Sequence, residues 1–167
     1  MIKAIIGTSV LAASLLVGGT APAAAAQAKP TFGPYGYGPV KLGMSLKKAR
    51  ATGAIVPKGP VKGSCTHWDL KRFPTGKDAS GVIISRKEGV VGIEGRKGMK
   101  TPEGIRIGST YKRLKKAYPR LYRRIDNAFR VDGVPGNRNK KVFYEFTVAK
   151  GKVTHMFMGI SPNRCFG

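Results

Sequence analysis

A nine-residue segment occurs twice in this chain and constrains its fold more than any other feature of the sequence. Residues 40–48 (VKLGMSLKK) and residues 105–113 (IRIGSTYKR) agree in residue class at eight of nine positions. A weaker likeness joins residues 89–93 to residues 151–155 at nearly the same offset along the chain. Because repeated segments indicate repeated structural units, we expect two similar halves.

Each half is expected to begin with a capped helix and to continue as strands. Ser45 and Thr110 stand where a hydroxyl would accept an unpaired amide hydrogen at a helix start, and Gly53 and Pro119 are expected to end the two helices. The predicted class is α+β, with two similar halves of helix and antiparallel meander forming one compact domain. Apolar patterns predict the strands at residues 65–70, 81–85, 90–93, 128–134, 141–148 and 153–160.

The beginning of the chain has the order of a secretory signal peptide. Lys3 precedes an apolar stretch, and small residues follow it as far as Ala28. Glycines end the apolar run before it reaches the roughly 20 residues that a membrane-spanning helix needs. We therefore expect a secreted, extracellular and monomeric protein without a transmembrane span. Its parts would be a signal peptide (1–28, cleaved near 26–28), a Gly/Pro/aromatic arm (29–39), a first half (40–100) and a second half (101–167).

The chain has two cysteines, Cys65 and Cys165. An even number of cysteines in an exported chain predicts a disulfide, which here would tie the end of the chain to its middle. Cys65, His67 and Asp69 also alternate along a predicted strand and would share one face. A metal or thiol site there is disfavoured, because residues two apart on a strand are separated by about 6 to 7 Å.

Part of the first half resembles the repeat of the secreted β-lactamase inhibitory proteins of actinobacteria. The likeness is carried by residues 42–45 (LGMS), by Gly53 and by residues 63–68 (GSCTHW), and residues 81–85 continue it. Related helix-and-meander units occur in outer-membrane assembly lipoproteins of the SmpA/BamE type. The resemblance extends to the second half only through the start of its helix.

The resemblance implies a concave sheet surface whose exposed aromatic side chains grip a target protein. By motif position Trp68 would be one of these side chains, and His67 and Phe73 lie close enough in the sequence to join it. The family also closes a disulfide within each repeat. In this chain Ser85 stands at the second cysteine position of the first repeat, and Trp68 is the single tryptophan.

Positive charge dominates the composition. There are 31 Lys and Arg against 8 Asp and Glu, a formal net charge of +23. Such a field attracts anions, although a basic surface also serves solubility alone. A smaller basic cluster is formed by Arg138, Lys140 and Lys141. The densest cluster lies in residues 112–124, and we expect its basic side chains to bind a partner: Lys112, Arg113, Lys115, Lys116, Arg120, Arg123 and Arg124.

These patterns favour a secreted, strongly basic, non-enzymatic binding or inhibitor-like protein. Its expected partner is an acidic macromolecule, either an anionic polymer of the cell envelope or an acidic protein, and nucleic acid would be bound without sequence preference. We expect no cofactor and no metal, and the sequence has no phosphate-binding loop, nucleophile elbow or zinc-protease helix.

Two other functions stay open. One is a small secreted nuclease-like hydrolase that uses Glu145 and His155 as acid and base. A two-residue turn at Lys150 and Gly151 would place this pair on opposite faces of a hairpin, and a slip of one residue would reverse that outcome. The other is an inhibitor of a secreted hydrolase, such as a β-lactamase, acting through Trp68.

Overall fold

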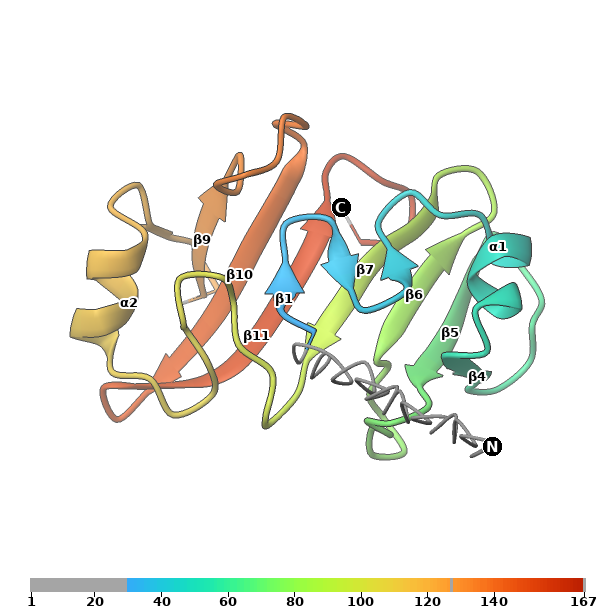
Figure 1. Cartoon of the computed structure of the whole chain (residues 1–167), viewed down its shortest axis with the longest axis horizontal. Coiled ribbons are helices and arrows are strands. Elements are labelled where there is room, and N and C mark those ends of the chain that lie inside the picture. The colour runs from blue at the N-terminus through green and yellow to red at the C-terminus, as the bar shows by residue number, and fades with distance from the viewer. Residues whose placement is uncertain (1–29, 127, 167) are drawn as a thin grey trace, which may run out of the picture.

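The computed structural model describes residues 30–126 and 128–166. The chain folds into an eight-stranded antiparallel sheet, a small three-stranded sheet and two short helices (Figure 1). The predicted signal peptide lies outside the described residues. The architecture is therefore mostly antiparallel sheet, with little helix.

Both predicted helix starts are confirmed. Helix α1 (Leu46–Ala51) is capped by Ser45, and helix α2 (Tyr111–Ala117) is capped by Thr110. Each hydroxyl accepts a hydrogen bond from the amide three residues later, at 3.4 Å in α1 and 3.2 Å in α2. These bonds satisfy amides that have no partner inside the helix.

The helices are only six and seven residues long. Gly53 has a φ of +65°, the left-handed conformation that ends a helix, and Pro119 follows α2 after one residue and has no amide to donate. The helical share is consequently smaller than the α+β prediction implies. No helix in the described part of the chain is long and apolar enough to cross a membrane.

Eight strands form the main sheet, in the order β4-β5-β6-β7-β11-β10-β9-β8. All six predicted strands are present, with ends shifted by a few residues, and two very short edge strands, β4 and β8, escaped prediction. The strands are β4 (Ile55–Pro57), β5 (Cys65–Leu70), β6 (Val82–Ser85), β7 (Gly89–Gly95), β8 (Tyr122–Arg123), β9 (Phe129–Asp132), β10 (Val142–Ala149) and β11 (Lys152–Ile160).

The repeated segments make matching backbone hydrogen bonds. In each segment, the amide of a glycine donates to the carbonyl of a valine on a later strand. The amide of that valine donates in turn to the carbonyl of the residue that follows the glycine. The three residues are Gly43, Val90 and Met44 in the first segment (2.8 and 2.9 Å) and Gly108, Val153 and Ser109 in the second (2.7 and 2.8 Å). Each segment is thereby attached to the strand that lies in the middle of the sheet, β7 or β11.

The arm forms a small sheet with the start of the first half: β1 (Phe32–Gly33) and β2 (Gly36–Tyr37) lie in the arm, and β3 (Val40–Lys41) opens the first repeated segment. We predicted an extended arm because its glycines and prolines disfavour regular structure, and these strands are a correction. They are only two residues long because Gly36 and Gly38, both with positive φ, turn the chain back on itself.

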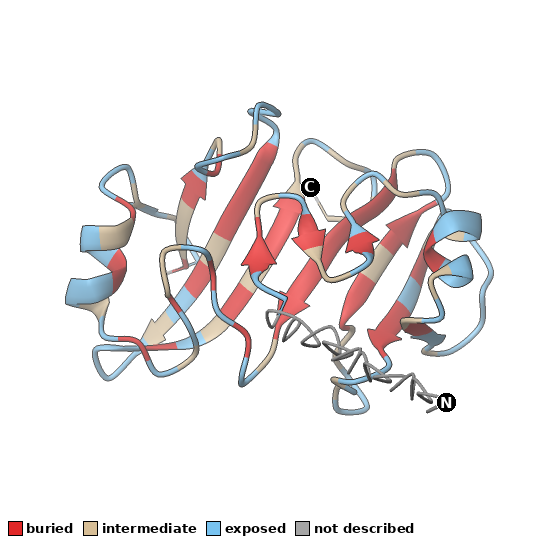
Figure 2. Ribbon diagram, in the orientation of Figure 1, coloured by how far each residue is buried: buried red, intermediate tan, exposed pale blue. Residues whose placement is uncertain are grey.

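The core lies on one face of the main sheet, between the sheet, the two helices and the arm. Phe32 of the arm is fully buried, and the Tyr144 hydroxyl donates to its carbonyl at 2.9 Å. Tyr118, next to α2, packs its ring against Tyr144 and Phe146. Figure 2 shows mostly buried residues along the strands of the sheet and exposed residues on the helices at its two ends. We call the opposite face, which carries Glu145 and His155, the open face.

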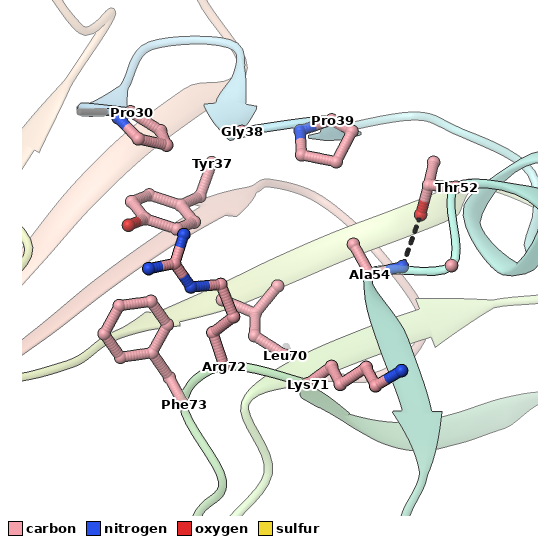
Figure 3. Close-up of a pocket in the computed structure, with 11 residues that line it drawn as sticks. Pro30, Tyr37, Gly38, Pro39, Thr52, Ala54, Leu70, Lys71, Arg72 and Phe73 are labelled. Atoms are coloured by element: carbon pink, nitrogen blue, oxygen red, sulfur yellow. Dashed lines mark hydrogen bonds between the residues drawn. The ribbon is translucent and has the colours of Figure 1, made fainter. Parts of the chain in front are cut away.

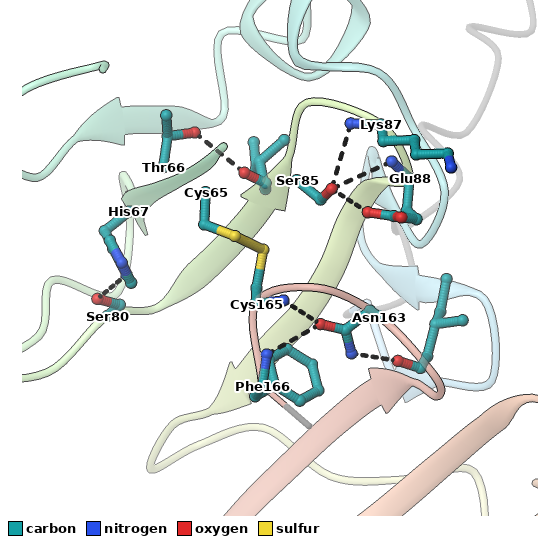
Figure 4. The surroundings of a disulfide bond; sticks show 12 residues. Cys65, Thr66, His67, Ser80, Ser85, Lys87, Glu88, Asn163, Cys165 and Phe166 are labelled. Atoms are coloured by element: carbon teal, nitrogen blue, oxygen red, sulfur yellow. Dashed lines mark hydrogen bonds between the residues drawn. A yellow bond between two sulfur atoms is a disulfide. The ribbon is translucent and has the colours of Figure 1, made fainter. Parts of the chain in front are cut away.

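The predicted disulfide between Cys65 and Cys165 is present, with partners 100 residues apart in sequence. It fastens the segment after β11 to the start of β5 (Figure 4). The side chain of Asn163 accepts hydrogen bonds from the amides of Cys165 and Phe166, at 2.8 and 3.0 Å. The end of the chain is thereby held over the open face.

Removing this disulfide should cost much of the stability of the fold. Closing so long a loop restricts the unfolded chain, so we expect the double variant C65A/C165A to lose about 2–5 kcal/mol of unfolding free energy. Urea unfolding measures the loss. Reductant should lower the wild-type protein to the same level and leave the variant unchanged; an unchanged midpoint in the variant would show that the bond carries no stability.

Two turn glycines offer a matched test of the contact between residues 43–44 and β7. Gly89 and Gly151 have φ of +77° and +70°, so alanine is strained at both. A Cβ on Gly89 would lie 2.6 Å from the carbonyl oxygens of Gly43 and Met44, whereas one on Gly151 meets nothing within 4 Å. We expect G151A to lose about 1–2 kcal/mol and G89A clearly more, in chemical denaturation. Equal losses would contradict the contact.

Candidate functional site

The three residues expected to grip a partner do not come together. Trp68 is 2% exposed, and its indole nitrogen donates to the Thr66 hydroxyl at 2.9 Å in the core. His67 is on the open face, 2.9 Å from the Ser80 hydroxyl. Phe73 packs edge-on against the Tyr37 ring, with centroids 5.6 Å apart. The expectation of an exposed Trp68 is wrong, because the even-numbered residues of β5 face the core, and no inhibitory surface is built on that side chain.

Asp69 shares the open face with Cys65 and His67, but each of the three has its own partner. Burial alone would raise the pKa of Asp69; hydrogen bonds from Thr75 and Gly81, together with the charge of Lys58, outweigh burial and lower it below its usual value. No group of three or more His, Cys, Asp or Glu side chains in residues 30–126 and 128–166 is arranged to hold a metal ion.

This cluster makes stability depend on pH. Because the folded pKa of Asp69 is lowered, its contribution is complete above the pKa of the unfolded chain, near 4, and is lost as pH falls through the folded value. We expect D69N to lose about 1–3 kcal/mol at pH 7 and the difference from wild type to shrink at pH 3, measured by urea unfolding. D78N, a change at an exposed carboxylate in the loop that follows β5, should alter stability little; equal effects of the two variants would contradict the role of Asp69.

Helix α2 presents its basic side chains to solvent. Leu114 is fully buried and Tyr118 is 1% exposed, so one side of the helix belongs to the core. On the outer side four basic residues are exposed, and we call them the α2 basic surface: Lys112, Arg113, Lys115 and Lys116.

The three arginines that follow α2 lie in three different places. Arg120 donates to the carbonyl of Gly133 at 3.2 Å and lines a hollow of about 440 Å³ together with Arg138 and Lys140. The structure therefore joins basic residues that are separate in the sequence. Arg123 lies exposed in β8. Arg124 instead approaches the open face, where it pairs with Glu145.

One extra residue on β11 decides which way Glu145 and His155 face. The two-residue turn at Lys150 and Gly151 is as predicted, and Ala149 pairs with Lys152 beyond it. Thr154 is then passed over, so Thr147 lies opposite His155 and Glu145 lies opposite Phe157. Side chains opposite each other in register share a face. Glu145 and His155 are thus on the same face, and the expectation that a two-residue turn places them on opposite faces is wrong.

Both residues line a hollow on the open face with a volume of about 570 Å³, which we call the open-face hollow. Three phenylalanine rings form part of its wall: Phe157 and Phe166 have centroids 5.2 Å apart, and Phe143 lies 6.1 Å from Phe157. The complete lining is Ile83, Arg124, Arg130, Phe143, Glu145, His155, Phe157 and Phe166.

Two paired glycines make room for these rings. Gly92 of β7 and Gly159 of β11 lie opposite each other in register. A Cβ on Gly159 would stand 2.7 Å from Cζ of Phe143, and one on Gly92 would collide with the Phe157 ring. A glycine inside an apolar strand is a sequence signal for a close approach, but the pairing of these two glycines follows only from the register of β7 and β11.

Charged groups flank the aromatic wall in pairs. The Arg124 guanidinium is 3.4 Å from the Glu145 carboxylate, and Nε2 of His155 is 3.7 Å from the Glu94 carboxylate. Glu145 and Glu94 lie on either side of Phe157 in the register of three strands. The Arg130 guanidinium stacks 3.7 Å from the centre of the Phe143 ring. The open-face hollow therefore holds one carboxylate, an imidazole and two guanidinium groups beside apolar surface, and the Glu94 carboxylate lies next to its imidazole.

A second, more apolar pocket lies where the arm meets the end of β5 (Figure 3). It has a volume of about 340 Å³. Figure 3 shows the side chains of Tyr37, Arg72 and Phe73 gathered at this pocket, with Leu70 behind them. Burial raises the pKa of Tyr37, and the charge of Arg72 opposes that effect. Phe73, expected from the sequence to bind a partner, is thus part of this pocket.

The chain matches no protein-family description, no curated protein and no solved structure. A function for this chain therefore has to be inferred from the arrangement of its own residues.

Proposed function

We propose that this is a secreted protein that binds an acidic macromolecule, an anionic polymer of the cell envelope, through a basic region centred on α2. The observation that carries the proposal is the α2 basic surface itself, four exposed basic side chains on one short helix. Arg120, three residues after α2, adds a hollow that it lines with Arg138 and Lys140, beside the carboxylate of Asp132. A flexible polyanion suits a helix surface of point charges better than a folded acidic protein does, because it adapts to their spacing.

The charge balance supports this proposal. Eight carboxylate side chains are too few to neutralise 31 Lys and Arg. The observed carboxylate pairs engage Lys58 near β4 and three arginines at the open face, Arg96, Arg124 and Arg130, none of them on α2. An anionic polymer would supply the missing negative charge, and the release of its counterions would favour binding.

We also propose that residues 40–100 and 101–167 are two copies of one helix-and-meander unit, as the resemblance to the actinobacterial inhibitory proteins implies. The matching hydrogen bonds of the two repeated segments support this. So does the order of elements, since in each part the helix is followed by four strands. Ser85 lies directly opposite Cys65, at the position where that family has its second cysteine. Secretion is supported by the disulfide, a bond typical of oxidising compartments.

Two charge-matched variants test the binding surface. K115A/K116A removes two charges from α2, and K47A/K48A removes two from α1, where both lysines are also exposed. With a glycerol-phosphate teichoic acid as the probe, we expect K115A/K116A to lower the slope of log affinity against log salt by about 1.4–1.8, or 0.7–0.9 per lost contact. The control should change the slope much less. Titration calorimetry at several salt concentrations measures both.

Equal losses in both variants would show that binding reflects net charge and not this surface. Wild-type affinity that does not fall with salt would exclude a polyanion and favour an apolar interface with a folded protein.

A further inference from the structure

Beyond binding, we propose that the open-face hollow cleaves RNA, with Glu145 as the general base and His155 as the general acid in attack by the ribose 2′-hydroxyl. This site is separate from the α2 basic surface. It would make the protein an enzyme, contrary to the expectation from its sequence.

Glu145 has the surroundings of a general base. Its side chain is 26% exposed, so solvent and a ligand reach it, and the Arg124 guanidinium lies 3.4 Å away. This pairing holds the carboxylate in place, and the carboxylate is the group that would accept the proton. Arg130 lies opposite Glu145 on β9, so two guanidinium groups stand where a phosphate would approach.

His155 has the surroundings of a general acid. Its ring is 45% exposed, and its Nε2 is 3.7 Å from the Glu94 carboxylate. That carboxylate is held in place by Arg96 at 2.8 Å. A fixed carboxylate at this distance forms an ion pair with a protonated imidazole and leaves the second ring nitrogen to donate its proton to a ligand.

The two groups are spaced for one phosphodiester. Glu145 is opposite Phe157, and His155 is two residues away on the same strand, so the pair is diagonal across two strands, with Cα atoms about 7–8 Å apart. In phosphoryl transfer the attacking and leaving oxygens lie in line on opposite sides of phosphorus. A base and an acid on either side of a bound phosphodiester reach one oxygen each.

The remaining lining suits a nucleotide. Phe157 and Phe166 are partly exposed rings at about 5 Å from each other, and aromatic side chains of this kind stack on nucleobases without strong sequence preference. The net charge of +23 draws polyanions toward the protein.

The reaction balances without a co-reactant. Glu145 takes the proton of the ribose 2′-hydroxyl, and the 2′-oxygen forms a bond to phosphorus. The bond from phosphorus to the 5′-oxygen breaks, and that oxygen takes the proton of the His155 imidazolium. The products are a 2′,3′-cyclic phosphate and a free 5′-hydroxyl. DNA lacks the 2′-hydroxyl and is not a substrate for this step.

The test uses the disulfide-bonded protein with a ribodinucleotide, UpA, and its 2′-deoxy analogue. We expect wild-type protein to convert UpA to a 2′,3′-cyclic phosphate, identified by mass spectrometry, and to leave the deoxy analogue intact. E145Q and H155Q should each lower the rate by about 100-fold or more, the size of a general acid or base contribution. H67Q changes the chain's other histidine, outside the hollow, and should keep the wild-type rate.

Circular dichroism and urea unfolding establish that each variant is folded before its rate is compared. The proposal is overturned if wild-type protein leaves UpA intact, if the deoxy analogue is cut equally fast, or if the H155Q and H67Q rates are the same. Cleavage of UpA and salt-dependent binding of teichoic acid are separate readouts, so either this inference or the proposed function can fail alone.

Discussion

The pairing of β7 with β11 is the contact on which the rest of the structure depends. Strand β7 is the last of β4 to β7, and β11 is the last of β8 to β11. The hydrogen bonds between β7 and β11 join these two sets of four strands into one sheet. Their register sets Gly92 opposite Gly159, which leaves space for the phenylalanine rings, and Glu94 opposite Phe157, which brings a carboxylate to the strand of His155. A different register would separate these groups, because each shift of one residue turns alternate side chains to the other face.

The sheet also divides the charge of the chain. Carboxylates gather on the open face, where Asp69, Glu94, Asp132 and Glu145 each pair with a basic side chain. The basic residues of α2 lie on the helical side, away from these pairs. Binding of a polymer and chemistry on a phosphodiester are thus assigned to different surfaces, one strongly cationic and one of mixed charge beside apolar rings.

The end of the chain completes the open face. The disulfide between Cys65 and Cys165 and the hydrogen bonds of Asn163 hold Phe166 against Phe157 and Phe143. The segment after β11 thereby contributes Phe166 to the wall of the open-face hollow. The disulfide therefore links the stability of the fold to the shape of the candidate site.

Local rules were sufficient for much of this protein. Helix caps at Ser45 and Thr110, six of the strands and the disulfide follow from the sequence alone, because each depends on neighbouring residues or on a simple count. Tertiary structure decided which face each side chain occupies. Trp68 is buried because β5 turns its even-numbered residues toward the helices. Glu145 and His155 lie on the same face because β11 carries one extra residue, Thr154. Facing depends on register across strands, and a single unpaired residue reverses it without any change in local pattern.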